Sequence, residues 1–267
     1  MNDRLARTFT RASLSLFALV PLFAVANERL LTVDTGDNGL YEINTSTGAR
    51  TFVATVTGAG IVGAMTYDAS TDTLYASSTN NNALYKLNYN TGVATLIGSY
   101  GGPALMHAIA FENGSLYGAT LFGDFYSINP LTGTASPEAN WGSGRVGDFA
   151  YKASTNTTYA IDVLDDNLYS VNPATAARTL IGSTGTNEQV GVGLAYSPDK
   201  GLFAVDNDTQ TFYSINESTG AASLIGSLGG TNDISLVFVG EQPVPEPASM
   251  AVLSLGVLAC LRRRRRS

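Results

Sequence analysis

Apolar and polar residues alternate over most of residues 27–240, in short runs separated by turns rich in Gly, Asn, Asp, Ser and Thr. No run has the three- and four-residue apolar spacing of an amphipathic helix. Alternation with a period of two is typical of strands that bury one face. The pattern therefore predicts one all-β domain over residues 27–240.

A five-residue motif recurs along this domain: an apolar residue, Tyr, a variable residue, an aliphatic residue and Asn. Its tyrosines are spaced by 44, 41, 43 and 44 residues and are Tyr41, Tyr85, Tyr126, Tyr169 and Tyr213. In most copies a strand ending in an aromatic residue and a second strand come first, and a Thr-Gly turn and a fourth strand follow. One four-stranded blade of a β-propeller per period explains this order.

The two ends of the repeat region complement each other. Residues 29–57 contain strands two, three and four of a blade, whereas residues 234–238 form a lone inner strand with the same aromatic ending. We therefore predict a five-bladed β-propeller in which the C-terminal strand completes the N-terminal blade and leaves no edge open. The repeats resemble WD40-like and YVTN-like propellers but lack their diagnostic dipeptides. The resemblance implies a fold only, and we interpret the Leu-Tyr pattern as packing between blades.

The C-terminal segment combines three signals. The motif Val244, Pro245, Glu246 and Pro247 precedes 14 residues without charge, 248–261, and these precede a basic cluster of Arg262, Arg263, Arg264, Arg265 and Arg266. As a helix of ~21 Å the apolar run is short for a ~30 Å hydrocarbon core, but arginine stems can snorkel to the headgroups. The segment predicts a membrane anchor with a cytoplasmic basic end.

This order of signals resembles the PEP-CTERM sorting signal of Gram-negative bacteria. The resemblance implies recognition by an exosortase-type membrane protease, removal of the tail and delivery to the cell surface. A protein handled in this way is an inner-membrane precursor first and a cell-surface or extracellular protein afterwards.

The N-terminal segment predicts export. Arg4, Arg7 and Arg11 precede an apolar run, and Ala24 and Ala26 are the small residues that a signal peptidase recognises. The expected organisation is a signal peptide at 1–26, the propeller at 27–240, a linker at 241–247, the anchor at 248–261 and a basic tail at 262–267. The one cysteine, Cys260, lies in the anchor.

Charge changes once the targeting segments are set aside. The whole chain carries −7; removing residues 1–26 and 248–267 takes away eight arginines and Asp3, which leaves −14 on residues 27–247. This acidity disfavours nucleic acid as a partner.

Candidate ligand residues lie in loops expected on one face of the propeller, where the fourth strand leads to the next inner strand. They are Tyr100, His107, Trp141, Arg145, Asp148, Asn187, Asn232 and Asp233. An aromatic platform with carboxylates and amides suits a sugar. Alternatively, Trp141 caps the channel, Asp148 and Asp233 accept hydrogen bonds from loop amides, and His107, the one histidine, is a packed residue.

No catalytic motif stands out. Glycoside hydrolysis needs two opposed carboxylates, and Asp148 and Asp233 are the evident pair. The sequence has no nucleophile motif, metal-binding histidine spacing or Gly-rich phosphate loop. Apart from calcium, which the acidic turn of Asp162, Asp165 and Asp166 could bind, no cofactor is evident; aspartates are also ordinary turn formers.

The sequence therefore favours an exported binding protein of the cell surface or extracellular matrix, with polysaccharide as a candidate partner. The alternatives are a polysaccharide-active glycosidase or lyase and a purely structural matrix component.

Overall fold

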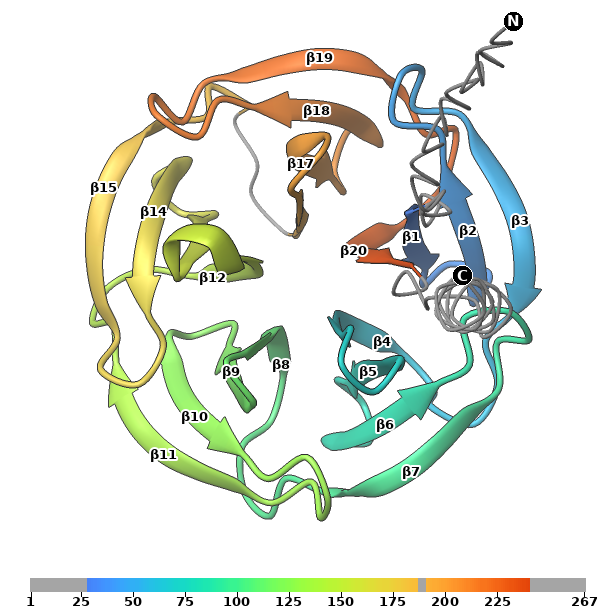
Figure 1. Cartoon of the computed structure of the whole chain (residues 1–267), viewed down its shortest axis with the longest axis vertical. Helices are drawn as coiled ribbons and strands as arrows, with labels where there is room; N and C mark the ends of the chain where they lie inside the picture. The colour runs from blue at the N-terminus through green and yellow to red at the C-terminus, as the bar shows by residue number, and fades with distance from the viewer. Residues whose placement is uncertain (1–27, 187–190, 241–267) are drawn as a thin grey trace, which may run out of the picture. The chain divides into compact units, whose positions relative to one another are not determined.

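The computed structural model describes residues 28–186 and 191–240. Within these ranges, twenty strands form five antiparallel four-stranded sheets, arranged as blades around a central axis (Figure 1). The predicted five-bladed propeller is confirmed. The predicted signal peptide and membrane anchor lie outside the described residues.

The strands of each blade are given from the centre outward. Blade 1 contains β20 (Asp233–Val239), β1 (Arg29–Asp34), β2 (Gly39–Ile43) and β3 (Arg50–Thr55). Blade 2 contains β4 (Val62–Asp68), β5 (Thr73–Ser78), β6 (Ala83–Leu87) and β7 (Ala94–Ser99). Blade 3 contains β8 (Met106–Glu112), β9 (Ser115–Thr120), β10 (Asp124–Ile128) and β11 (Ala135–Asn140). Blade 4 contains β12 (Val146–Lys152), β13 (Thr157–Asp162), β14 (Asn167–Asn172) and β15 (Ala177–Ser183), with a 3-10 turn, η1 (Ala153–Thr155), after β12. Blade 5 contains β16 (Val192–Ser197), β17 (Gly201–Asp206), β18 (Thr211–Ile215) and β19 (Ala222–Ser227).

Blade 1 closes the ring with strands from both ends of the domain. β20 pairs with β1 in antiparallel register, with Arg29 opposite Val239 and Leu30 opposite Phe238. Figure 1 shows the red β20 beside the blue β1. The inner strand that residues 29–57 lack is thus supplied from the C-terminal side, as predicted, and β1 has no free edge.

The hydrophobic core is divided among the five junctions between neighbouring blades. Each apolar cluster contains side chains from two adjacent blades. The residue before each repeat tyrosine is fully buried in every blade: Leu40, Leu84, Phe125, Leu168 and Phe212. Because burial of one such side chain contributes about 1.5–3 kcal/mol, the repeat secures each junction in the same way. The interpretation of this position as inter-blade packing is confirmed.

The Thr-Gly turns also join neighbouring blades, a role that no pattern in the sequence predicts. Gly133 has φ 77°, the left-handed conformation that glycine adopts without strain. The turn lies against Gly98 of the preceding blade, where an added Cβ would overlap the carbonyl oxygen of Thr132. The same contact recurs between the pairs Gly182 and Thr219, and Gly226 and Thr47.

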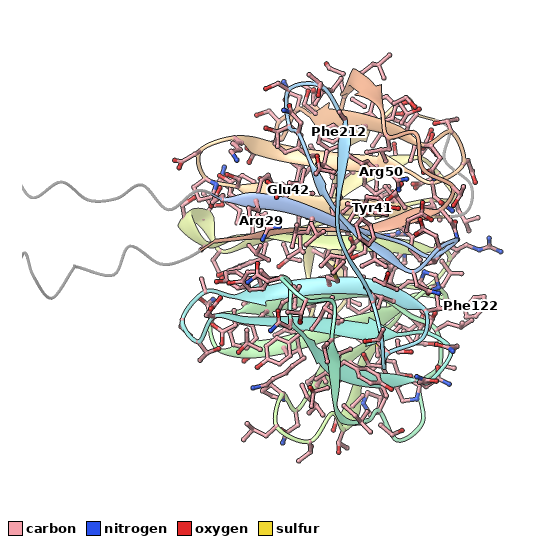
Figure 2. All side chains as sticks on the ribbon, turned by 90° about the vertical axis from the view of Figure 1, so that its right-hand side faces the viewer. Arg29, Tyr41, Glu42, Arg50, Phe122 and Phe212 are labelled. Atoms are coloured by element: carbon pink, nitrogen blue, oxygen red, sulfur yellow. The ribbon has the colours of Figure 1, made fainter. Side chains whose placement is uncertain are left out.

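The propeller has two distinct faces. The loop face carries two kinds of connection: those between blades, and those between the second and third strands of one blade. The two kinds lie side by side in blade 2, where Tyr100 N–H, after β7, donates to Asn82 O, between β5 and β6, at 3.0 Å. The turn face carries the other two kinds of turn and both ends of the described domain, Glu28 and Gly240. In the side view of Figure 2, Arg29 and Glu42 lie toward the turn face, and Phe122 projects from the loop face.

Candidate functional site

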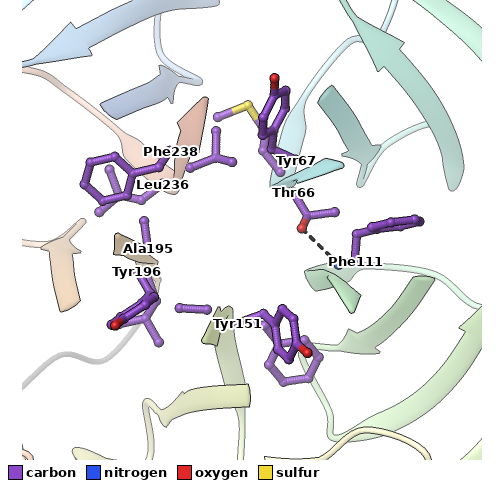
Figure 3. Close-up of a pocket in the computed structure, with 13 residues that line it drawn as sticks. Thr66, Tyr67, Phe111, Tyr151, Ala195, Tyr196, Leu236 and Phe238 are labelled. Atoms are coloured by element: carbon purple, nitrogen blue, oxygen red, sulfur yellow. Dashed lines mark hydrogen bonds between the residues drawn. The ribbon is translucent and has the colours of Figure 1, made fainter. Parts of the chain in front are cut away.

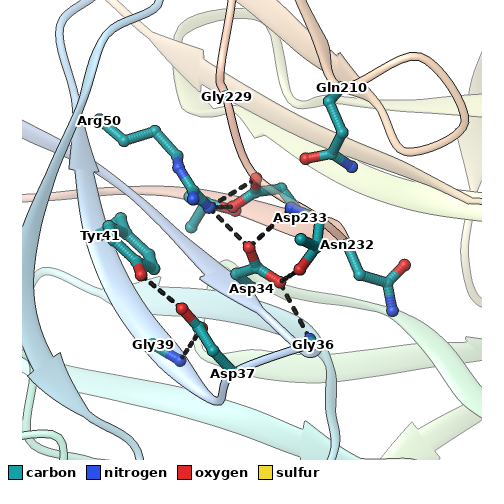
Figure 4. Close-up of polar contacts among 12 residues, drawn as sticks. Asp34, Gly36, Asp37, Gly39, Tyr41, Arg50, Gln210, Gly229, Asn232 and Asp233 are labelled. Carbon is teal, nitrogen blue, oxygen red and sulfur yellow. Dashed lines mark hydrogen bonds and ion pairs between the residues drawn. The ribbon is translucent and has the colours of Figure 1, made fainter.

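A buried ion cluster occupies the loop face of blade 1 (Figure 4). Arg50, on the outermost strand, reaches inward to Asp34 at 2.8 Å and to Asp233 at 2.9 Å. The N–H and hydroxyl of Thr231 each donate to Asp34 at 2.9 Å. Both carboxylates are almost fully buried, and the guanidinium lies 4.0 Å from the ring centre of Tyr41. The cluster joins β3, β1 and β20 where the ring closes.

The two carboxylates share one guanidinium but differ in pKa. Burial opposes the charge of Asp34, yet the N–H groups of Thr231 and Gly36 and the guanidinium of Arg50 hold its pKa below the usual value. For Asp233, burial outweighs the attraction of Arg50 and raises the pKa to about 6. Asp34 is therefore the principal counter-ion of Arg50.

Blade 4 contains a matching cluster. Arg178 on β15 pairs with Asp162 at 3.0 Å and donates to Ser143 O at 3.1 Å. Its guanidinium lies 4.3 Å from the ring centre of Trp141 and 4.8 Å from that of Tyr169. Trp141 is only 7% exposed. Its indole packs between blades 3 and 4 under Arg178, instead of standing as an open platform for a sugar.

Two other candidate residues are largely enclosed. Tyr100 is fully buried in the junction between blades 2 and 3, where burial raises its pKa. His107 is half-buried at a bulge near the start of β8, and burial lowers its pKa. A neutral imidazole is therefore favoured there.

Two further loop candidates, Arg145 and Asn232, form hydrogen bonds within the loops, mainly through their backbone groups. Arg145 N–H donates to Asp162 at 2.9 Å. Asn232 O accepts a hydrogen bond from Thr35 N–H at 3.0 Å, and its side-chain amide bonds the Thr35 hydroxyl. Asn187 lies outside the described residues.

The acidic turn that could bind calcium is engaged by groups of the protein. Asp162 accepts hydrogen bonds from two backbone N–H groups as well as from Arg178, and Asp165 accepts one from Tyr169 OH at 2.6 Å. Asp166 accepts hydrogen bonds from Thr184 and Thr186. In residues 28–186 and 191–240, no group of three or more His, Cys, Asp or Glu side chains is placed to hold a metal ion. Calcium at this turn stays a prediction.

Asp148 lies in the central channel, where it joins three inner strands. Its carboxylate accepts hydrogen bonds from Phe149 N–H at 2.8 Å in β12 and from Leu194 N–H at 2.9 Å in β16. A third bond comes from Leu236 N–H in β20. The side chain is completely buried, and this burial outweighs the N–H donors and raises the pKa well above its usual value. Asp148 therefore links the inner strands of blades 4, 5 and 1 by hydrogen bonds across the channel.

The opposite end of the channel opens into a cavity on the turn face (Figure 3). It has a volume of about 100 Å³ and is lined by residues of all five inner strands. Each blade contributes one aromatic side chain from the same strand position, and Figure 3 shows these side chains around the opening: Tyr67, Phe111, Tyr151, Tyr196 and Phe238. We call this opening the turn-face mouth. The aromatic endings were visible in the sequence, but nothing there assigned them a site. Part of each ring also packs into a blade junction, as Phe111 does on Tyr75 and Phe238 on Phe203.

Polar groups surround the turn-face mouth. Tyr67 OH lies 2.7 Å from the Asp72 carboxylate, and Tyr151 OH lies 2.9 Å from Asn156 Oδ1. Glu217 accepts hydrogen bonds from Lys152 at 2.7 Å and from Tyr159 OH at 2.8 Å. An apolar, aromatic opening with a polar rim is typical of small-molecule and sugar sites.

The loop face also exposes large apolar side chains that the sequence analysis did not single out. They are Ile61, Leu105, Phe122 and Leu164, between 37% and 61% exposed. Leu105 has φ 58°, which is unusual for a bulky residue and costs about 1–3 kcal/mol. Its carbonyl accepts a hydrogen bond from Leu121 N–H, next to Phe122.

Comparisons with known proteins agree with the two main features of the chain. Residues 243–266 match the PEP-CTERM protein-sorting motif. This motif implies an exported protein that an exosortase processes. A search of curated protein sequences returns no match. Among the described residues, no helix is both long and apolar enough to cross a membrane.

Solved structures share the propeller fold. A chain in the crystal structure of a nidogen/laminin complex is 10% identical, with a TM-score of 0.56, over 80% of this chain and 98% of that one. The virginiamycin B lyase of Staphylococcus aureus is 14% identical, with a TM-score of 0.47, over 73% of this chain and 68% of the lyase. At these identities the likeness concerns the fold alone.

Proposed function

We propose that this exosortase-sorted propeller is a cell-surface or matrix protein that binds polysaccharide without cleaving it. The turn-face mouth is the observation that carries the proposal. One aromatic side chain from each of the five blades lines a cavity of about 100 Å³ there, and hydroxyl, amide and carboxylate groups lie around these rings. Aromatic surfaces next to polar groups suit sugar rings, which are apolar on their faces and polar at their edges.

The state of the two candidate catalytic carboxylates favours binding over cleavage. Asp148 and Asp233 are both fully buried. Asp148 accepts hydrogen bonds from inner-strand N–H groups, and Asp233 pairs with Arg50. A glycosidase acid or base must reach the glycosidic oxygen or a water molecule, and carboxylates engaged in this way are poorly suited to that task.

The test uses the processed protein purified from a secreting host. It is incubated with neutral, acidic and amino-sugar polysaccharides, and bound protein and new reducing ends are measured together. We expect saturable binding without new reducing ends, and weaker binding after the substitution Tyr196→Ala. New reducing ends would favour the enzyme alternative, whereas self-association without glycan binding would favour the structural one.

A second candidate function, docking of a protein partner, is favoured by the exposed apolar side chains of the loop face. Phe122 is 57% exposed, and Leu105 adopts a strained conformation nearby. The propeller of similar fold in the nidogen/laminin complex is found with a protein partner. If this function holds, Phe122→Ser will abolish cross-linking to surface proteins and leave glycan binding unchanged.

The route to the surface is also open to test. We propose signal-peptide removal after Ala26, insertion of residues 248–261 into the inner membrane, and cleavage of the tail at the motif of residues 243–266. Mass spectrometry of the exported protein should show Asn27 at the N-terminus and a C-terminus before Arg262. Glu246→Ala should block tail removal but not export, and an uncut C-terminus at Ser267 in wild type would contradict the route.

A further inference from the structure

The hydrogen-bonding groups inside the turn-face mouth are mainly backbone amides. Each inner strand has a partner on one side only, so alternate N–H groups of these strands point toward the channel. Leu194 N–H and Phe111 N–H both point away from their own sheet and donate to residues of another blade. The first donates to Asp148 of the preceding blade at 2.9 Å, and the second to the hydroxyl of Thr66 at 3.0 Å (Figure 3).

The hydrogen bond from Phe111 N–H to the Thr66 hydroxyl has no equivalent hydroxyl acceptor in the other blades. The aromatic residue of each inner strand has the same register with its second strand, in the pairs Tyr67 and Leu74, Phe111 and Leu116, Tyr151 and Thr158, Tyr196 and Leu202, and Phe238 and Leu30. The five aromatic N–H groups therefore point in equivalent directions. At the position of Thr66, however, the other blades have Ala110, Ala150, Ala195 and Val237. Methyl and isopropyl groups accept no hydrogen bond.

We infer that the turn-face mouth binds the acetyl group of an uncharged, acetamido-bearing sugar, with its carbonyl oxygen accepting hydrogen bonds from the inner-strand N–H groups and its methyl group packed on Ala150, Ala195 and Val237. This inference rests on the proposed function, because it specifies the sugar that the mouth recognises.

The size and lining of the cavity fit this group. A volume of about 100 Å³ exceeds the share of one water molecule, about 30 Å³, but it does not enclose an oligosaccharide. One substituent enters while the sugar chain lies across the aromatic rim. Ala150, Ala195 and Val237 line the cavity and offer methyl-sized apolar contacts. The methyl of an acetamido group suits these apolar side chains, and its carbonyl oxygen, a strong acceptor, suits the inner-strand N–H groups.

Charge favours an acetyl group over a carboxylate. Residues 27–247 carry −14, and Asp72 and Glu217 lie among the rim contacts. Glu112 follows Phe111 on β8, and Asp148 lies deeper in the channel. Lysines also lie at the rim, with Lys152 5.1 Å from the ring centre of Tyr196 and Lys200 5.5 Å from that of Phe238, and burial raises the pKa of Asp148 well above its usual value. The rim therefore carries both signs of charge, and it is the net charge of the domain that disfavours a uronate over a neutral carbonyl.

The test compares short oligomers of N-acetylglucosamine, glucosamine, glucose and a uronic acid by calorimetric titration of the processed protein. We expect the acetylated oligomer to bind at least about tenfold more tightly than the others, since one acetyl group adds both hydrogen bonds and methyl burial. Equal affinity for acetylated and deacetylated oligomers, or a preference for the uronate, would overturn the inference and leave polysaccharide binding standing. Failure of every oligomer and polymer to bind would overturn both.

Two matched variants test the amide contact. Ala195→Thr places a hydroxyl where Phe238 N–H can use it, as Thr66 does for Phe111 in the wild-type chain. Ala195→Val has nearly the same shape but no acceptor. We expect Ala195→Thr to bind the acetylated oligomer about three- to tenfold more weakly than Ala195→Val, with similar melting temperatures. Equal affinities in the two variants would show that the inner-strand N–H groups do not donate to the acetyl carbonyl oxygen, and would overturn the inference. The reverse variant, Thr66→Ala, frees Phe111 N–H and should bind at least as tightly as wild type; a loss of binding would count against the inference.

Discussion

The loop face and the turn face differ in what lies at the end of the channel, although acidic residues of both faces accept hydrogen bonds from the protein. On the turn face, Asp68 accepts them from Ser70 and Thr71, and Glu217 accepts them from Lys152 and Tyr159. On the loop face, acidic residues engage groups of the protein: Asp34, Asp162 and Asp206 accept hydrogen bonds from N–H groups two residues ahead at 2.8 to 3.0 Å, and two of them also pair with arginine. On the turn face, aromatic side chains surround a cavity lined by strand edges. The comparison teaches that abundant acidic residues need not mark a site on either face, because a binding surface requires groups that the fold has not already used.

Deleting β20 tests whether one strand supports both faces. Its first residue, Asp233, belongs to the loop-face ion cluster, and Phe238 lies at the turn-face mouth. Removal of residues 233–239 opens the edge of β1 and strips apolar cover from two junctions. The loss should exceed the about 5–15 kcal/mol that stabilises a typical domain, so cooperative unfolding should disappear from a thermal melt. Leu131→Ser, at an exposed turn residue, is the control. An unchanged melting temperature in the deletion variant would refute closure by β20.

Substituting the two loop-face arginines separates closure from ordinary support. Arg50→Met leaves two buried carboxylates without their cation and should cost about 3–5 kcal/mol of unfolding free energy. Arg178→Met leaves only one buried carboxylate, that of Asp162, without its cation, and Arg178 is more exposed than Arg50. We therefore expect a loss of about 1–3 kcal/mol of unfolding free energy. Urea titration measures both losses. If Arg178→Met cost more than Arg50→Met, the closing cluster would have no special weight.

The pH dependence of stability offers a finer test of the same cluster. The folded-state pKa of Asp233, about 6, lies above its usual value of 3.8, so the folded protein holds this proton more tightly than the unfolded chain. The resulting contribution is fully present below about pH 3.8 and is lost as the pH rises through about 6. Asp34 contributes in the opposite sense, because its lowered pKa adds stability that is lost as the pH falls.

Asp233→Asn should therefore remove a decline in unfolding free energy, on the order of 1–3 kcal/mol, between about pH 4 and about pH 7. Urea titrations across this range measure it, with Asp199→Asn at an exposed residue as the control. A decline of the same size in Asp233→Asn and wild type would assign the proton to another group.

The fold was largely predictable because its signals are local. The spacing of Tyr41 and its equivalents gave the blade, and the unmatched strand at residues 234–238 gave the closure. The roles of the acidic residues were not predictable to the same extent. Arg50 is 16 residues from Asp34 but 183 from Asp233, and only the closed ring brings all three together.

The turn-face mouth illustrates a different limit. Its aromatic residues were evident in the sequence, but how far neighbouring blades cover them depends on the width of the channel. The inner strands approach one another closely at Asp148, which bonds two neighbouring strands, and at Gly193, which has no side chain. A Cβ at Gly193 would lie 2.8 Å from Leu236 N, so β16 and β20 approach closely there. Such packing between distant segments leaves no periodic signal in the sequence.

A last comparison, within the turn face, concerns the ring tyrosines Tyr67 and Tyr151. Tyr67 OH lies 2.6 Å from Gly240 O, so it holds the end of β20. Tyr151 OH instead contacts the side chains of Asn113 and Asn156, which lie in turns. Each substitution to Phe should cost about 1 kcal/mol, because one hydroxyl donor is lost in either case. Only Tyr67→Phe should speed hydrogen exchange of the Val239 and Gly240 amides, by about fivefold. Nuclear magnetic resonance of the two variants measures this difference. Equal exchange at the end of β20 in both would mean that the strand is held by its pairing with β1 alone.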